Sequence, residues 1–264
     1  MKKTALLIID AQYDFCNPNG TLYVPGAGKD MERIASLIAL EGDKIDSIFL
    51  TLDTHQVLDM AHPLFWEDQN GNTIAPFTLI SAQSVETGKW VPRYHREYVL
   101  KYLQTLEAEG EFQHFIWPEH CLIGSKGAAI DDTLMHSVLA WAHRTRRNYH
   151  TVSKGINPLT EHFGVFKAQV PVTNAPETEL NERFLADLNA FDQVLVAGEA
   201  RSHCVATSVR QIVKYAPELA KKVIALTDSM SDVPNFGHFA DPIFEEAAKS
   251  GLKFMKAGQV FKEN

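Results

Sequence analysis

The sequence predicts an α/β fold, a doubly wound and mostly parallel open sheet that is interrupted by one inserted segment. Short apolar runs bounded by polar turns recur along the chain, segments with helical spacing of apolar residues separate them, and a single stretch breaks this alternation. The chain has 264 residues, of which 45% are hydrophobic, and this is enough to bury one large core. We therefore expect a single domain over residues 1–264.

Five apolar runs are expected to form strands that are buried on both faces, as in a parallel sheet. They cover residues 5–9, 47–52, 150–153, 193–197 and 222–227. Between them, apolar residues follow helical spacing in 31–38 and in 184–188. A further helix is expected to begin near Ser202, with Pro217 beyond its end, and it carries Cys204 in its first turn.

Residues 66–115 fit this alternation poorly and are interpreted as an insertion, because glycines and prolines precede an aromatic and charged stretch over 94–106. Its aromatic residues could form a lid, an oligomer contact, or a separate cluster in a plain surface excursion. They are Trp66, Trp90, Tyr94, Tyr98 and Tyr102.

The charge and cysteine content restrict the class of protein. A net charge of -8 and a pI near 5.8 argue against a nucleic-acid surface, which needs clustered basic residues. Three cysteines without a CxxC pair fit reduced thiols better than a disulfide framework. The apolar run after Met1 is too short for a signal sequence or a membrane span, so we expect a cytoplasmic protein whose partner is a small molecule or another copy of the chain.

Polar residues follow four of the expected strands, at the edge where open α/β sheets bind ligands. Asp10 follows the first strand, Asp53 and His55 the second, Lys154 the third, and the 198–204 loop with Cys204 the fourth. Taken singly, each has an ordinary role as a helix cap, a solvated side chain or a small buried residue. Together they predict a nucleophilic site, in which Lys154 and the helix N-terminus lower the pKa of Cys204 and Asp10 accepts its proton.

These residues resemble the isochorismatase-like cysteine hydrolases, and among them the nicotinamidases. The resemblance spans nearly the whole chain and rests on five motifs in order. They are Ile8-Ile9-Asp10-Ala11-Gln12-Tyr13-Asp14-Phe15, Asp53-Thr54-His55, Trp117-Pro118-Glu119-His120-Cys121, Lys154-Gly155, and Gly198-Glu199-Ala200-Arg201-Ser202-His203-Cys204-Val205.

The resemblance implies a triad of Asp10, Lys154 and Cys204 that hydrolyses a small carboxamide through a cysteine thioester. It also implies a cis peptide bond between Glu199 and Ala200, which aims backbone N–H groups at the oxyanion. Nicotinamide is the expected substrate, another small amide or a ureido compound the alternative. The aromatic residues Phe15 and Trp117 are expected either to hold the substrate ring or to pack in the core.

By the same resemblance, Asp53, His55 and His120 hold a divalent metal, commonly zinc, that binds the pyridine nitrogen of the substrate. Residues two apart on a strand end point to the same side, which lets the first two converge. His62, following Asp59, is the alternative third ligand. The family implies no nucleotide cofactor, and we expect a homo-oligomer.

The chain departs from nicotinamidases around the expected pocket. It has Asp53-Thr54-His55-Gln56 where Asp-Trp-His-Pro is usual, and Arg201-Ser202-His203 precedes the cysteine where Thr-Asp-Tyr is usual. Glu161-His162-Phe163-Gly164 replaces the usual stretch after the lysine, and the insertion separates His55 from His120 by 65 positions. Three alternatives therefore stay open: a metal-free isochorismatase-type hydrolase, a non-catalytic binding module, and a redox-sensing thiol.

Overall fold

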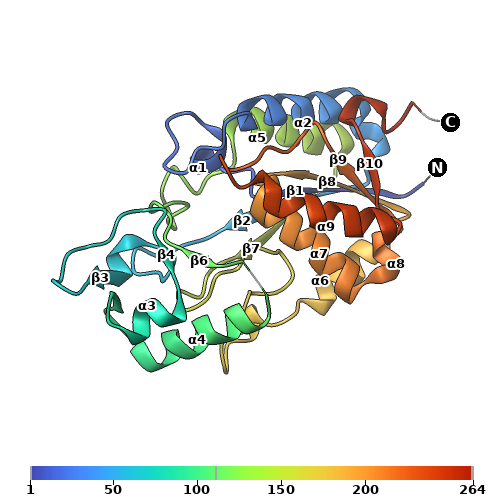
Figure 1. Ribbon diagram of the computed structural model, residues 1–264. Helices are drawn as coiled ribbons and strands as arrows, with labels where there is room; N and C mark the ends of the chain where they lie inside the picture. The colour runs from blue at the N-terminus through green and yellow to red at the C-terminus, as the bar shows by residue number, and fades with distance from the viewer. Residues whose placement is uncertain (1, 111, 263–264) are drawn as a thin grey trace.

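A six-stranded parallel sheet forms the centre of the computed structural model, which describes residues 2–110 and 112–262 (Figure 1). The strand order is β10-β9-β8-β1-β2-β7. The bounds are β1 Thr4–Ile9, β2 Ser47–Asp53, β7 His150–Lys154, β8 Gln193–Gly198, β9 Val223–Leu226 and β10 Lys253–Met255. All pairings between them are parallel, which confirms the predicted fold class.

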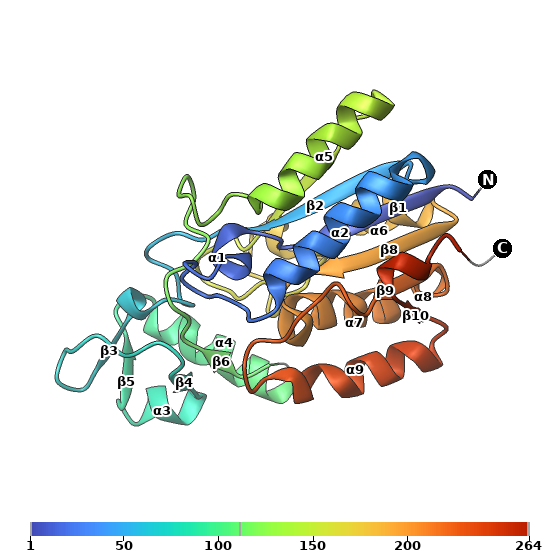
Figure 2. The same ribbon diagram turned by 90° about the horizontal axis from the view of Figure 1, so that it is seen from above.

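Helices cover both faces of this sheet (Figures 1 and 2). One face carries α2 and α5, and the opposite face carries α6, α7 and α9. The bounds are α1 Tyr13–Cys16, α2 Ala27–Glu41, α5 Asp132–Thr145, α6 Glu182–Asn189, α7 Ala206–Tyr215, α8 Pro217–Ala220 and α9 Gly237–Lys249. Each of α2, α5, α6, α7 and α9 buries one apolar stripe against the sheet or a neighbouring helix, which is the arrangement that amphipathic spacing produces.

The strands differ in burial, and the expectation that all five apolar runs are buried on both faces was wrong for residues 150–153. Every residue of β1 is fully or almost fully buried, and its apolar sequence follows from this central position. In β7, however, residues 150, 151 and 153 are exposed, because β7 pairs only with β2 and forms an edge of the sheet. Only Lys154, at its end, is buried.

Residues 66–115 contribute no strand to the six-stranded sheet. They form two small antiparallel sheets and two helices beside it (Figure 1). The bounds are β3 Trp66–Asp68, β4 Leu79–Ile80, α3 Ala82–Glu86, β5 Trp90–Pro92, α4 Arg96–Ala108 and β6 His114–Phe115. Trp66 and Tyr102 are buried in a second hydrophobic cluster formed mostly by this segment, so these two aromatics belong to a core rather than to a lid.

The strand order places a topological switch point between β1 and β8. From β1 the chain proceeds to β2 and then β7 on one side, and it returns to β8 on the other side. Loops leaving β1 and β8 therefore diverge and open a crevice at the carboxyl ends of these strands. Asp10 follows β1 and the segment with Cys204 follows β8, so both flank this crevice.

Candidate active site

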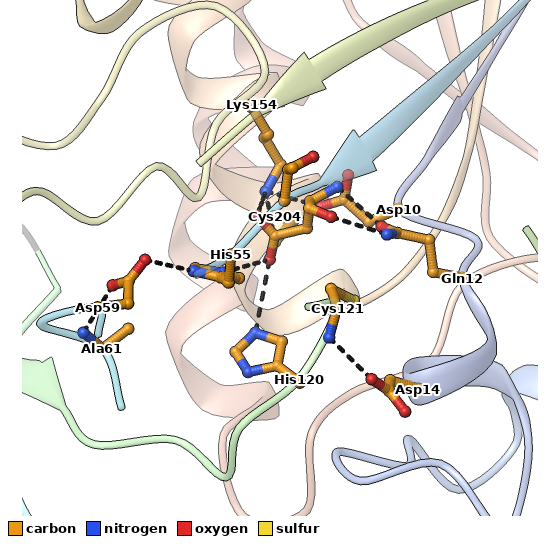
Figure 3. Close-up of polar contacts among 12 residues, drawn as sticks. Asp10, Gln12, Asp14, His55, Asp59, Ala61, His120, Cys121, Lys154 and Cys204 are labelled. Atoms are coloured by element: carbon orange, nitrogen blue, oxygen red, sulfur yellow. Dashed lines mark hydrogen bonds and ion pairs between the residues drawn. The ribbon is translucent and has the colours of Figure 1, made fainter. Parts of the chain in front are cut away.

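A buried ammonium group lies at the centre of the site. Lys154, the last residue of β7, has its Nζ 2.9 Å from Asp10 Oδ2 and 2.9 Å from Asp53 Oδ1. The same ammonium donates to Cys204 Sγ at 3.7 Å (Figure 3). The lysine, cysteine and aspartate expected from the sequence are thus brought together, and all three are buried.

The segment that carries the thiol begins with a cis peptide bond between Glu199 and Ala200, as expected. A single π-helical turn, Arg201–Val205, follows and leads directly into α7. The Val205 N–H donates to Ala200 O at 3.1 Å and closes this turn. The expected helix is therefore present, but its first turn is wider than an α-helical turn.

Asp10 is held by a short polar contact across β1 and β2. The Thr51 hydroxyl donates to Asp10 Oδ1 at 2.5 Å and accepts from the Asp10 N–H at 2.9 Å. Burial raises the pKa of Asp10, Lys154 opposes this, and the neighbouring Asp53 adds to it. A carboxylate with a raised pKa is a better proton acceptor than an exposed aspartate.

The pKa of Cys204 differs from the sequence expectation. Burial raises it well above the usual value, and the carboxylates of Asp10 and Asp53 add to this increase, whereas Lys154 lowers it. Lys154 lowers this pKa as expected, but burial outweighs it and Asp10 and Asp53 add to the rise, so the net direction is opposite to the expected one. In this state the Cys204 side chain is a thiol.

Asp53 also faces two histidines. Its Oδ2 lies 3.2 Å from His55 Nε2 and 3.6 Å from His120 Nε2, and one ligand atom from each of the three residues falls within 4.8 Å of the others. Burial would raise the pKa of Asp53, but Lys154 and His55 outweigh it and hold that pKa well below the usual range. The carboxylate therefore stays ionised, as a metal ligand must.

Asp59 and the carbonyl oxygen of Pro118 orient the imidazoles of His55 and His120 toward Asp53. His55 Nδ1 lies 2.9 Å from Asp59 Oδ2, and His120 Nδ1 lies 2.8 Å from Pro118 O. Asp53 and Asp59 raise the pKa of His55, so a metal bound at its Nε2 would displace a proton while Nδ1–H still donates to Asp59. A carboxylate and two imidazoles disposed in this way fit a divalent first-row metal.

His62, the alternative third ligand, lies behind His120. Its Nε2 is 3.3 Å from His120 Nδ1, the nitrogen that points away from Asp53, and its own Nδ1 is 3.1 Å from Gln56 O. Burial and the two neighbouring histidines lower the pKa of His62 to about 2, so this ring is neutral. The structure groups His120, and not His62, with Asp53 and His55.

An aromatic pocket opens beside the thiol. Its lining includes Phe15, Trp117, Phe163, His203, Asp53 and Cys204. The ring of His203 lies 5.2 Å from that of Trp117 and 5.4 Å from that of Phe163. Burial lowers the pKa of His203 to about 3, so it adds a neutral ring to the wall.

No protein-family model matches the chain. Two curated relatives do match. A nicotinamidase of Saccharomyces cerevisiae is 22% identical, over 91% of this chain and 94% of its own length. A nicotinamidase of Escherichia coli is 26% identical, over 88% of this chain and 85% of its own length. The solved structure of the yeast nicotinamidase superimposes with a TM-score of 0.66 at 20% identity, covering 96% of this chain and 99% of that one. The chain is similar to nicotinamidases over most of its length and shares their fold.

A second solved structure, a pyrazinamidase of Pyrococcus horikoshii in complex with zinc, superimposes on this nicotinamidase relative with a TM-score of 0.54. It is 16% identical and covers 96% of this chain and 99% of its own. At this level the likeness concerns the fold.

Sequence reasoning missed the residues that support the site. The Gln12 side chain clamps the backbone of Asp53, since its Nε2 donates to Asp53 O at 2.7 Å and its Oε1 accepts from the Asp53 N–H at 2.8 Å. Asp59 was named only as the neighbour of His62, and Glu161 was expected around the pocket but given no role; it does line the pocket. The one available signal was the position of Gln12, two residues after Asp10 in the first motif.

Proposed function

We propose that this chain is a cysteine-dependent amidohydrolase that converts a small carboxamide to the acid and ammonia, with nicotinamide as substrate and nicotinate as product. The observation that carries the proposal is the meeting of three buried groups, because Lys154 contacts both Asp10 and Cys204 at the switch point of the sheet. The similarity to two nicotinamidases over most of the chain supports the choice of substrate.

In the first half-reaction, the Asp10 carboxylate accepts the proton of the Cys204 thiol, and the sulfur attacks the carboxamide carbon. The backbone N–H groups of Ala200 and Cys204 are assigned to the oxyanion that forms. Asp10 then donates its proton to the departing nitrogen, so that ammonia leaves and a thioester remains.

In the second half-reaction, water replaces ammonia at the thioester. Asp10 takes one proton from the water as its oxygen attacks, and the same proton returns to the sulfur when the acid leaves. Lys154 stays charged between Asp10 and Asp53 throughout, because these two residues raise its pKa more than burial lowers it. Its role is to hold Asp10 and stabilise the sulfur as negative charge develops there.

Asp53, His55 and His120 are assigned as ligands of a divalent metal, zinc being the expected ion. When bound, the metal would take the pyridine nitrogen of nicotinamide as a ligand and offset the excess negative charge of the two carboxylates. Phe15 and Trp117 are assigned to the ring of the substrate, and both line the pocket beside Cys204.

The remaining parts of the proposal concern the whole molecule. We infer that residues 1–264 act as one domain with 66–115 as an insertion, and that the chain works as a cytoplasmic homo-oligomer. Within the described residues, no helix combines the length and apolar character that a bilayer crossing requires. Sedimentation velocity and cell fractionation test the oligomeric state and the location.

An ammonia-release assay over nicotinamide, pyrazinamide, benzamide and small aliphatic amides tests the function, with elemental analysis of the same protein. We expect release from nicotinamide and its loss in Cys204→Ala. Benzamide lacks the ring nitrogen, so equal turnover of benzamide would contradict the metal-anchored pose and leave the amidase assignment standing. Release from none of the amides would contradict the assignment and favour an isochorismatase-type reaction on a vinyl ether.

A further inference from the structure

A second group of buried acids lies at the nucleophile turn, residues 199–205, and does not line the pocket. Glu199 directly follows β8 and is fully buried, and Asp30 in the first turn of α2 is 3% exposed. Ser231 joins them: its N–H donates to Glu199 Oε2 at 3.1 Å, and its hydroxyl donates to Asp30 Oδ2 in a short hydrogen bond. Neither acid takes part in the mechanism above as a group that touches substrate.

The two carboxyl groups have different sets of donors. Asp30 accepts from Ser231 and, at its other oxygen, from Arg33 Nη1 at 3.0 Å, as suits a carboxylate. For Glu199 Oε1, in contrast, the described part of the chain supplies no hydrogen-bond donor. A fully buried carboxylate oxygen without a donor is costly, whereas a protonated one is itself a donor.

The surrounding charges do not neutralise Glu199. From α2 it faces Asp30, whose other oxygen binds Arg33, from α1 the Cys16 thiol, and from the loop after β9 Asp232, which pairs with Arg201 at 2.7 Å. Burial raises the pKa of Glu199 well above its usual value, and Asp30 and Asp232 add to it. Burial also raises the pKa of Asp30, whereas Ser231 and Arg33 lower it, so the proton of the pair is favoured on Glu199.

This pair is connected directly to the nucleophile turn. Ser231 O accepts from the Arg201 N–H at 2.8 Å, and Ser202 Oγ accepts from the Val233 N–H at 3.1 Å. Val233 also lines the pocket with Cys204. Close packing leaves little freedom here, since a Cβ on Gly26, whose φ is +106°, would lie 2.5 Å from Ser231 Oγ.

We propose that Glu199 and Asp30 form a carboxylic acid–carboxylate pair that shares one proton and, through Ser231, positions the 199–205 turn and the pocket wall at Val233. Glu199 is a positioning residue in this scheme: its acid hydrogen is donated to Asp30, and α2, the turn and the loop after β9 are thereby held together. Loss of the shared proton places two anions side by side in a buried site and loosens the turn. The catalytic consequence rests on the proposed function, but the shared proton does not.

The test compares the thermal midpoint of wild type and Glu199→Gln as a function of pH. Glutamine keeps a donor toward Asp30 but cannot ionise. At pH values above the ordinary pKa of glutamate, the folded wild type keeps a proton that the unfolded chain has released. The stability of wild type relative to Glu199→Gln therefore falls as the pH rises above that value. For one proton in a chain of this size, the difference in thermal midpoint between the two proteins should change by about 3 to 5 °C per pH unit.

Glu218→Gln is the matched control, because Glu218 is 72% exposed at its side chain and forms a surface ion pair with Lys221 three residues away. Its curve should run parallel to that of wild type. Asp30→Asn provides a second variant in case Glu199→Gln does not fold: without the partner anion, the fall in stability should level off at a lower pH than in wild type. Curves for Glu199→Gln or Asp30→Asn that run parallel to wild type overturn the shared proton.

Activity measurements on the same variants test the positioning role. The ratio of kcat/KM for Glu199→Gln over wild type should rise with pH, and Glu199→Ala, which has no donor, should lose more activity than Glu199→Gln. A ratio that is constant with pH overturns the positioning role. If the chain releases no ammonia from any amide, the proposed function fails while the stability curves still decide whether the proton is shared.

Discussion

Replacing Lys154 by methionine gives the sharpest test of the electrostatic arrangement. The ammonium lies 2.9 Å from an oxygen of each of two buried aspartates. At roughly 3 Å and an effective dielectric constant near 20, each attraction is about 6 kcal/mol, most of which offsets the cost of burying the charges. Removing one partner of such a buried group typically costs about 3 to 5 kcal/mol, so we expect the midpoint of thermal unfolding to fall by roughly 6 to 20 °C.

The pH dependence of this variant gives the sign of the effect. In wild type the pKa of Asp53 is held well below the usual range, so its contribution is present above the usual aspartate pKa and is lost as pH falls. Without Lys154, burial and mutual repulsion raise the pKa of Asp53 as well as that of Asp10, which burial already raises in wild type. That contribution is present at low pH and is lost as pH rises, so acidification from neutral pH should stabilise the variant relative to wild type.

Differential scanning calorimetry between pH 4 and pH 8 measures both quantities. Lys221→Met is the matched control, since Lys221 is 58% exposed at its side chain and its pair with Glu218 should be worth only about 0.2 to 1 kcal/mol. A Lys154→Met protein with the stability and pH slope of wild type would show that the buried cluster does not exist in solution, and it would refute this reasoning.

Two further predictions concern the metal ligands and the pocket. His120→Ala should lose at least tenfold in zinc affinity, measured by equilibrium dialysis. His62→Ala removes only a partner of His120 and should lose less. Equal losses in the two variants would contradict the assignment of His120 as the third ligand. Burial raises the pKa of Glu161 to about 8, so this acid favours folding at low pH and that contribution is lost as pH rises toward 8. Relative to Glu161→Gln, wild type should therefore lose up to about 4 kcal/mol of unfolding free energy between pH 4.5 and pH 8 in urea titrations, and no relative change would show that Glu161 is ionised throughout.

The sheet could be predicted from sequence where strands are central and apolar. Residues 5–9 and 193–197 match β1 and β8 closely, because strands covered on both faces must be apolar throughout. The three-residue β10 escaped because 253–255 is too short and mixed to give a pattern. The burial of β7 was misjudged because its edge position depends on the strand order, which periodicity does not contain.

In the candidate site, too, some residues could be predicted from the sequence, whereas properties that depend on contacts in space could not. Asp10, Lys154 and Cys204 could be singled out because each follows a strand at one edge of the sheet, and the resemblance grouped them. The direction of the Cys204 pKa could not be predicted, because it depends first on how deeply the sulfur is buried, and Asp10 and Asp53 add to that effect. Asp53 was assigned only to the metal, although it also faces Lys154. The clamp by Gln12 likewise depends on two loops meeting in space.

The central claim is that Cys204 becomes acylated during amide hydrolysis, and a trapped intermediate tests it most directly. The protein is mixed with nicotinamide, quenched in acid during turnover, digested and examined by mass spectrometry. We predict one nicotinoyl group on the peptide that contains Cys204, and none when the same experiment is done with Cys204→Ala. Ammonia release without this adduct, together with turnover by Cys204→Ala, would contradict the account.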